Sequence, residues 1–346
     1  MSRWEIGEPS KLHKLGLEIP INRVERTIGW KNAVGGFPES VRSDVDGMWD
    51  GHGFLPAVTV GRILEILGVE VGTLMMQLLP VAQQYAVVPV SHYQVGAVAV
   101  GMPKHGTGFC NIYLGANFEF VDSALSFSVH AEQSAINNAW LNGEIGIQAM
   151  AISAAPCGYC RQFLYELTSA QQLSILLPND PNNPLSFSSA PLIAFLPNAF
   201  GPRDLGVTGG LMDPRLCTHN LALDGGPPID SVIATALAAA CGSYAPYKTD
   251  ASYGYAGVAV ELADNSIYAG RYAENAAYNP SLSPLESALS FMNMNQPPSR
   301  ARMVVRCVLV EVSNLASQLS ATRAVLAAYA PGVSVEYCKA KMSSIE

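Results

Sequence analysis

Charged residues are scarce in this chain of 346 residues, because Asp, Glu, Lys and Arg together make up only 14% of it. No run of Lys and Arg occurs, and the formal net charge is −8. Proteins that hold a polynucleotide backbone usually present clustered basic residues, so this composition disfavours nucleic acid as a partner. Apolar residues amount to 49%, which is too many for a disordered chain. We therefore expect a two-domain globular protein that binds a neutral or small ligand.

Targeting and membrane segments are also missing from the pattern. The N-terminal stretch MSRWEIGEPSKLHKLG carries charges of both signs and no apolar core, unlike a secretory signal. No charged residue occurs from Val71 to Pro103, but Pro80, Gln83 and His92 interrupt this stretch before about 18 apolar residues accumulate. Five of the seven cysteines stand alone, which fits a reducing compartment better than a disulfide framework. We expect a cytoplasmic protein that does not enter a membrane.

The first half of the chain alternates between helical and strand-like patterns. The opening 53 residues show no clear periodicity, and we predict no definite structure for them. Residues 179–191, NDPNNPLSFSSAP, read as a loop because turn-forming residues dominate. Strand and helix patterns in alternation are typical of an α/β layer. The first predicted element is a helical region over 59–88, broken near 68–72 and at Pro80. A hairpin with a long loop follows, with strands over 93–101 and 109–120. The later elements are a helix that begins at His130, a strand over 147–155, a helix from Pro156 and a strand over 173–178.

The pattern repeats after residues 223–230, LDGGPPID, which read as a linker. The later stretch YGYAGVAVELADNSIYAG resembles the earlier YQVGAVAVGMPKHGTGFCNIYLG, and an internal duplication is the economical explanation. In this alignment Glu286 corresponds to Glu132, while Pro284 takes the place of His130. No cysteine pair follows in the second copy, so we expect it to keep the fold without the metal chemistry.

The strongest local signal for chemistry is PCGYC, Pro156 to Cys160. Two cysteines three apart at a helix start lie on nearly one face, and the helix N-terminus lowers the pKa of a thiol. Alone, the pair fits a redox motif or chance as well as a metal site. With His130 it provides one imidazole and two thiolates, which leave zinc a fourth position open for catalysis. Glu132 is then a candidate proton shuttle, and HxE followed by PCxxC is the zinc deaminase signature.

Several segments closely resemble the two-domain, homodimeric class of cytidine deaminases. They are LGANFEF, HAEQSAI, AAPCGYCRQFLYEL, LPNAFGPRDL and YAENAAYNP, and the resemblance extends from about Leu55 to the C-terminus. It implies an α/β fold, a three-layer α-β-α sandwich with a mixed sheet, present as a catalytic and a degenerate copy after a small helical N-terminal region. The implied units are residues 1–85, 86–222, the linker 223–230 and 231–346.

The resemblance also implies an activity. It is the hydrolytic removal of the 4-amino group of free cytidine and deoxycytidine in pyrimidine salvage, which yields the uridine nucleosides and ammonia. One Zn²⁺ per chain, held by His130, Cys157 and Cys160, would supply an activated hydroxide. Glu132 would move the protons, alternating between base and acid.

The remaining site residues are assigned by the same resemblance. Asn117 and Glu119 would grip the ribose hydroxyls, although a turn at a strand end is the alternative. Tyr93 and Phe200 would place aromatic rings against the pyrimidine, although either could be plain core. The backbones of Ala131, Ala155 and Cys157 would read the base. Ala259 would reach the pocket of the partner in a homodimer, whose second domain completes the site, unless it is an ordinary buried alanine.

Two other functions share parts of this pattern. A polynucleotide deaminase uses the same zinc motif, but the acidic composition and the Asn117 and Glu119 pair favour a free nucleoside. A zinc scaffold without activity would need the three ligands only. The presence of Glu132, which zinc binding does not require, argues against that alternative.

Overall fold

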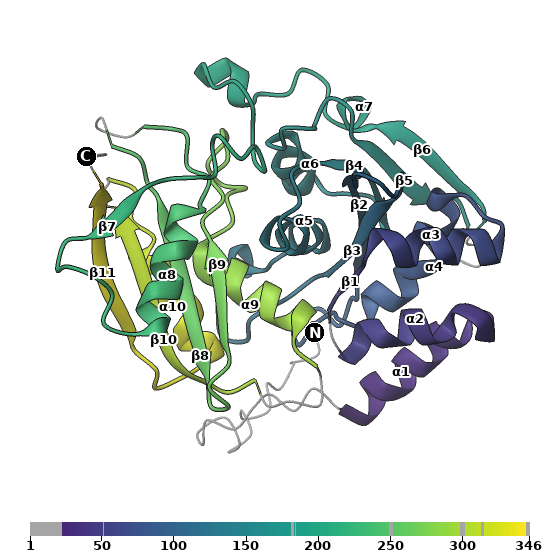
Figure 1. Ribbon diagram of the computed structural model, residues 1–346, viewed down its shortest axis with the longest axis horizontal. Coiled ribbons are helices and arrows are strands. Elements are labelled where there is room, and N and C mark those ends of the chain that lie inside the picture. Colours follow the sequence, from purple (N-terminus) through teal and green to yellow (C-terminus); the bar gives the residue numbers. More distant parts are fainter. Residues whose placement is uncertain are drawn as a thin grey trace, which may run out of the picture.

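Two mixed β-sheets, each covered by helices on both faces, make up the molecule (Figure 1). The computed structural model describes residues 23–50, 52–180, 183, 185–248, 252–297, 302–312 and 315–343. The first sheet has the order β1-β3-β2-β4-β5-β6, with β1 Phe54–Leu55, β2 Gly96–Pro103, β3 Cys110–Ala116, β4 Ile147–Ile152, β5 Ser174–Pro178 and β6 Phe187–Pro191. The second has the order β7-β11-β10-β8-β9, with β7 Leu221–Leu223, β8 Ala256–Leu262, β9 Ile267–Arg271, β10 Val304–Val312 and β11 Val335–Met342.

The two sheets repeat one pairing scheme. In the first, β2 pairs antiparallel with β3 and β4, β5 is parallel to β4, and β6 is antiparallel to β5. In the second, β8 pairs antiparallel with β9 and β10, β11 is parallel to β10, and β7 is antiparallel to β11. This repetition confirms the predicted duplication of an α/β unit.

Helices lie on both faces of each sheet, so the strands are buried from two sides. Along β2, Ala97 and Ala99 face one hydrophobic core while Val98 and Val100 face another, as the two-residue period of a strand requires. The helices are α3 Ala57–Leu67 and α4 Val71–Gln83 on one face of the first sheet, α5 Ala131–Leu141, α6 Gly158–Tyr165 and α7 Leu192–Phe195 on the other side, α8 Ser231–Cys241 on one face of the second sheet, and α9 Pro284–Asn295 and α10 Leu319–Tyr329 on its other side. Two 3-10 turns, η2 Leu125–Phe127 and η3 Pro202–Leu205, complete the elements.

Helices α5 and α9 pack against each other between the two sheets (Figure 1). Asn137 Nδ2 donates to Ser287 O at 2.9 Å, and Ser290 Oγ donates to Ser134 Oγ at 3.0 Å. In the first bond the residue of α5 lies one turn further along its helix than the residue of α9 does. In the second bond the residue of α9 lies one turn further along. The contact therefore has approximate two-fold symmetry, with equivalent residues meeting in reciprocal pairs.

The symmetry fixes which residues of the two copies correspond. A Cβ atom on Gly115 of β3 would lie 2.1 Å from Ala135 N, and one on Gly270 of β9 would lie 2.1 Å from Ala288 N. Both positions must be glycine so that the helix can lie close against its strand. These contacts pair Ala135 with Ala288, so the residues that precede each alanine correspond as well.

The first residues of the two helices show the same correspondence. His130 is the N-cap of α5, and its N–H donates to Gln133 Oε1 at 3.1 Å. Ser283 is the N-cap of α9, and its N–H donates to Glu286 Oε2 at 3.0 Å. The same capping arrangement closes both helices, with a different acceptor in each.

The predicted alignment of the copies is therefore wrong by one residue. Ser283, and not Pro284, takes the place of His130, and Glu286 corresponds to Gln133. The position of Glu132 is taken by Leu285. The alignment error arose from matching two glutamates that have different roles. At the positions equivalent to His130 and Glu132, the second copy consequently lacks both the metal-binding imidazole and the carboxyl group.

Two helices lie in the N-terminal region for which no definite structure was predicted. They are α1 Arg23–Gly35 and α2 Glu39–Asp50. Val41, Val45 and Met48 recur at helical spacing and are buried in a core shared with α3, α4 and the outer face of the first sheet. The small helical N-terminal region implied by the resemblance is thus confirmed for the described residues, while residues 1–22 lie outside them.

Two further expectations are corrected. Residues 179–191 are not a loop throughout, because β6 occupies the end of this segment and pairs with β5. The strand is polar and lies at the sheet edge, so it has no hydrophobic run to reveal it. Pro80 does not end α4, which continues to Gln83. Leu79 and Val81 on either side are buried, and this packing outweighs the one lost hydrogen bond.

The described residues contain no single helix long and apolar enough to cross a membrane. Helices α3 and α4 satisfy the length and composition criteria only as a pair, and they bend by 105° at the break between them.

Candidate active site

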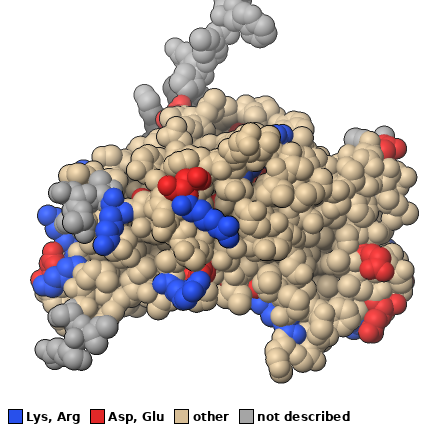
Figure 2. All heavy atoms as spheres, turned by 90° about the horizontal axis from the view of Figure 1, so that it is seen from above, with Lys and Arg blue, Asp and Glu red and all other residues tan. Residues whose placement is uncertain are grey.

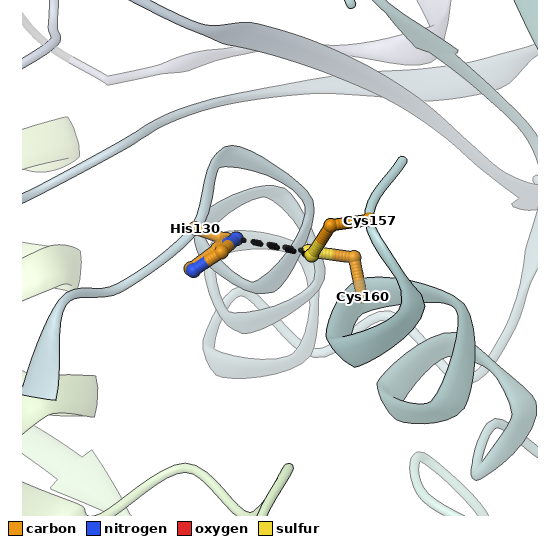
Figure 3. Close-up of side chains that lie close together, drawn as sticks. All are labelled: His130, Cys157 and Cys160. Carbon is orange, nitrogen blue, oxygen red and sulfur yellow. Dashed lines mark hydrogen bonds between the residues drawn. The ribbon is translucent and has the colours of Figure 1, made fainter. Parts of the chain in front are cut away.

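Three ligand atoms converge where α5 and α6 begin, as Figure 3 shows. His130 is the N-cap of α5, Cys157 is the N-cap of α6, and Cys160 lies in the first turn of α6. His130 Nδ1 lies 3.3 Å from Cys160 Sγ and 3.6 Å from Cys157 Sγ, and the two sulfur atoms are 3.6 Å apart. The three residues predicted from sequence to bind a metal are therefore brought together.

The spacing of these atoms fits zinc. Zn–S bonds of about 2.3 Å and Zn–N bonds of about 2.0–2.1 Å in a tetrahedron put the sulfurs about 3.8 Å apart and each sulfur about 3.6 Å from the nitrogen. The observed separations of 3.3 to 3.6 Å are close to these values. Among the described residues the cluster has only three members, so one coordination position is left for solvent or substrate, as in catalytic zinc sites.

The two thiols have different environments, and this prepares them to bind a cation. Cys157 is exposed, whereas Cys160 is buried. The hydrogen bond between the two sulfur atoms lowers the pKa of Cys157 to about 5. The same interaction, together with burial, raises the pKa of Cys160. One thiolate is thus present at neutral pH, and a bound metal ion displaces the proton from the other.

Glu132 lies in the first turn of α5, directly beside the metal-binding group. Its side chain is only 4% exposed, and burial raises the pKa of its carboxyl group. A hydrogen bond to Cys160 and the charge of His130 act in the opposite direction. A buried carboxyl group in such a position can accept a proton and return it within one reaction.

Asn117 and Glu119 follow β3 and hold the segment that carries Tyr93. Asn117 Oδ1 accepts from Val95 N at 2.9 Å, and its Nδ2 donates to Tyr93 O at 2.9 Å. The Glu119 carboxylate accepts from Ser91 N at 3.0 Å and from Ser91 Oγ at 2.5 Å. Both side chains therefore shape this loop, whatever they bind in addition.

The other predicted substrate residues lie at the surface or next to the ligands. Tyr93 is 63% exposed and Phe200 is 46% exposed, which rules out the alternative that they are core residues. Phe200 O accepts from Gln162 Nε2 at 2.7 Å, which joins its loop to α6. Ala131 is the first residue of α5, and Ala155 is exposed just before α6.

Ala259 has a different place from the one expected. It is 0% exposed in the middle of β8, where it pairs with Ala269 on β9 and Val308 on β10. It has no exposed surface in the single chain, which favours the alternative that it is an ordinary buried strand alanine.

Two residues that support His130 were missed at the level of sequence. The ring of Tyr159, which lies between the two cysteines, is 5.3 Å from the His130 ring and tilted by 30° to it. Gln133 accepts the His130 N–H and so fixes the start of α5. A polar residue three positions after a helix start is a capping signal, and it could have identified Gln133.

Zinc held by one imidazole and two thiolates, with a buried carboxyl group close by, is the machinery by which zinc-dependent deaminases activate water. The fold and the site therefore define that class of enzyme. Comparison with known proteins identifies the family within it. Models described as "Cytidine and deoxycytidylate deaminase zinc-binding region" match residues 70–175 and residues 192–324.

The relatives share most of their length with this chain. It is 42% identical over 285 residues to a cytidine deaminase of Sodalis glossinidius, which covers 80% of this chain and 86% of the relative. It is 43% identical over 265 residues to a cytidine deaminase of Aliivibrio fischeri, which covers 76% of this chain and 81% of the relative. The chain belongs to the cytidine deaminase family. A solved cytidine deaminase from Mycobacterium tuberculosis matches with 26% identity and a TM-score of 0.31, over 38% of this chain and 99% of that one.

Proposed function

We propose that this protein is a zinc-dependent enzyme that hydrolyses free cytidine and deoxycytidine to the uridine nucleosides and ammonia in pyrimidine salvage. The observation that carries the proposal is the convergence of His130, Cys157 and Cys160 beside Glu132. Deamination of cytidine agrees with the names of the relatives above. Deoxycytidine is included because it retains the 3′-hydroxyl that Asn117 and Glu119 would hold.

The site residues divide the chemistry among them. Zinc, when bound, makes a water molecule in its open position acidic enough to react near neutral pH. Glu132 would carry one proton of the attacking water to the pyrimidine ring nitrogen and the second proton to the departing amine. His130, Cys157 and Cys160 would hold the ion, and the backbones of Ala131, Ala155 and Cys157 would orient the base.

The ribose and the two faces of the base are assigned to the neighbouring loops. Asn117 and Glu119 would bind the ribose hydroxyls with the hydrogen-bonding capacity that their loop contacts leave free. Tyr93 and Phe200 would stack against the pyrimidine, which explains two aromatic side chains exposed near polar groups.

A homodimer would complete this pocket. Cys157, Tyr93 and Phe200 are all exposed in one chain, whereas hydrolysis at a controlled position requires a more enclosed site. With Ala259 buried, Tyr278 is the better candidate to be contributed by the second copy of a partner chain. It is 67% exposed and has a φ of 61°, which holds its ring on a tight turn after β9.

A free nucleoside suits the molecular surface better than a polynucleotide does. On the face shown in Figure 2, Lys and Arg side chains are scattered singly or beside acidic ones, and no continuous basic stripe crosses it. A net charge of −8 agrees with this distribution.

The same proposal covers the organisation and location of the chain. The units would be residues 1–85, 86–222 and 231–346, with 223–230 as the linker. All seven cysteines are unpaired, which supports a reducing compartment such as the cytoplasm.

A panel of substrates tests the proposal. The purified protein is incubated with cytidine, deoxycytidine, CMP and a cytosine-containing oligonucleotide, and ultraviolet absorbance and ammonia are followed. We expect turnover of the two nucleosides and none of the oligonucleotide. Turnover of the oligonucleotide alone would instead support a polynucleotide deaminase, and zinc binding without any turnover would support a scaffold.

A further inference from the structure

Glu166, the residue that follows α6, is buried against residues of the second copy. Glu166 is only 1% exposed, although it immediately follows a helix of the catalytic copy. Its Oε1 accepts from Tyr244 OH at 2.6 Å and from Tyr247 OH at 2.5 Å, and its Oε2 accepts from Ala276 N at 2.9 Å. Three donors thus surround a single carboxylate, and all three belong to the degenerate copy.

The end of α6 receives a second bond from the same copy. Glu166 N bonds to Phe163 O at 3.1 Å, so the helix tightens and Gln162 O loses its usual partner. Asn275 Nδ2 donates to Gln162 O at 3.1 Å and replaces that partner. Helix α6 has only 8 residues, about 12 Å of helix, and helices this short are marginal by themselves.

The residues that hold α6 are the counterparts of the loop beside the catalytic site. Glu274 Oε2 accepts from Tyr247 N at 3.1 Å, just as Glu119 Oε2 accepts from Val90 N at 3.0 Å. The degenerate copy therefore keeps the turn of the catalytic copy, but its side chains contact a helix of the other copy. The isolated bridges agree, because Val87 to Phe118 to Val129 in the first copy matches Tyr244 to Ala273 to Leu282 in the second.

We infer that the degenerate copy positions the metal ligands of its own chain through α6. Cys157 and Cys160 lie at the start of this helix, and Glu166 lies at its end. Because α6 is short, anchoring Glu166 and the Gln162 carbonyl fixes the orientation of the whole helix and hence of both sulfur atoms. Glu166 and its partners are positioning residues, since none of them contacts the metal group directly.

Zinc release tests this inference without any substrate. In the zinc-loaded double variant Tyr244→Phe/Tyr247→Phe, Glu166 loses both phenol donors while the ring volumes are kept. We expect zinc transfer to an excess of a chromogenic chelator to be about 10-fold faster than in the unmodified protein, the lower end of the effect of removing support around metal ligands. Asn275→Ala removes the other anchor and is expected to act in the same direction.

The matched control is Tyr113→Phe. Tyr113 is also a buried tyrosine whose hydroxyl donates to a buried carboxylate, Glu144 Oε2, at 3.1 Å, but the described hydrogen bonds and ion pairs of Tyr113 and Glu144 involve no residue of α6. Loss of the Tyr113 hydroxyl should lower the free energy of unfolding without loosening α6. Zinc release should therefore remain at the rate of the unmodified protein. Equal release rates in the control and in the double variant would overturn the inference.

The single variant Tyr247→Phe is measured in the same way if the double variant does not fold. It leaves the Tyr244 hydroxyl on Glu166, so an intermediate rate is expected, and a rate equal to the control overturns the inference. The measurement takes zinc as the bound ion but does not depend on the identity of the substrate. Failure to deaminate cytidine would refute the proposed function and leave this result unaffected.

Discussion

At the scale of single residues, the position of His130 explains how a ligand and a carboxyl group two places apart serve one site. Within a helix, residues at this spacing point about 200° away from each other. His130 has a φ of −79° and a ψ of 157°, which is extended backbone, so only Glu132 belongs to the helix itself. The change from strand-like to helical backbone between them is what allows both side chains to lie beside the same ion.

Gly115 is the residue whose substitution is expected to damage the site most from a distance. In Gly115→Ala the new Cβ would lie 2.1 Å from Ala135 N and 2.5 Å from Ala131 O, both backbone atoms of α5. Helix α5 must then move away from β3 and take His130 with it. We expect a loss of about 2–3 kcal/mol in the free energy of unfolding and a weaker affinity for zinc, measured by denaturant titration and metal competition.

Gly47→Ala provides the control for this substitution. Gly47 is an exposed residue inside α2, and a Cβ there would meet no atom within 4 Å. Alanine favours the helix over glycine, so stability should rise by about 0.5–1 kcal/mol with zinc affinity unchanged. A stable Gly115→Ala variant that keeps its zinc affinity would show that the close contact between strand and helix is not required.

At the scale of the elements, the first turn of α9 has a titratable carboxyl group, Glu286, where the first turn of α5 has the amide of Gln133. The pH dependence of stability can measure the effect of this difference. Glu286 is buried, and burial raises its pKa to about 7, while the hydrogen bonds from Ser283 act in the opposite direction. Tyr159 is the titratable group that faces it. The folded protein therefore binds a proton more tightly than the unfolded chain does, and stability falls as pH rises from about 4.5 to about 7.

Glu286→Gln gives α9 the residue that α5 already has in Gln133. The amide oxygen can still accept from Ser283 N, and no buried carboxylate has to ionise. The variant should nearly equal the unmodified protein at pH 4.5 and exceed it at pH 8, with a gain of about 3 kcal/mol in the free energy of unfolding. Denaturant titrations across this range measure it. Glu65→Gln, at an exposed position of α3, is the control, and a gain in stability that does not depend on pH would contradict the assignment.

The elements also show which parts of the fold are open to prediction from sequence. The strands β2 and β4 were found because their runs of apolar residues are typical of buried strands, and α5 was found because His130 and Glu132 mark its start. The strand β6 was missed since its residues are polar and end in Pro191. The predicted alignment of the two copies matched Glu286 with Glu132 because both are glutamates. The contacts of Gly115 with Ala135 and of Gly270 with Ala288 show that Glu286 corresponds to Gln133 instead.

At the scale of the whole molecule, the described residues contain one group of metal ligands, in the catalytic copy, and the protein should therefore contain one zinc ion per chain. Elemental analysis measures this ratio. Removing zinc with a chelator should lower stability as well as abolish activity, by about 4 kcal/mol where free zinc had been 1,000 times its dissociation constant. Return of zinc should restore both properties. Two zinc ions per chain would contradict the loss of ligands seen at Ser283 and Leu285.

The metal ligands could be predicted from sequence, whereas the contacts that anchor helix α6 could not. His130, Cys157 and Cys160 reveal themselves because the chemistry of zinc restricts residue type and the helix starts restrict position. The anchoring of Glu166 by Tyr244 and Tyr247 joins residues about 80 positions apart, and no local pattern encodes such a contact. Likewise, the burial of Ala259 depends on its place in the second sheet, which a single alanine cannot signal.

The most direct test of the account compares Glu132→Gln with the unmodified protein for zinc content and cytidine turnover. The substitution keeps the size of the side chain and all three metal ligands, but it removes the group that moves protons. We expect one zinc ion per chain in both proteins, with turnover of cytidine lowered by at least about 10²-fold in the variant. A zinc-loaded Glu132→Gln variant that deaminates cytidine at the unmodified rate would show that Glu132 does not move the protons of the reaction.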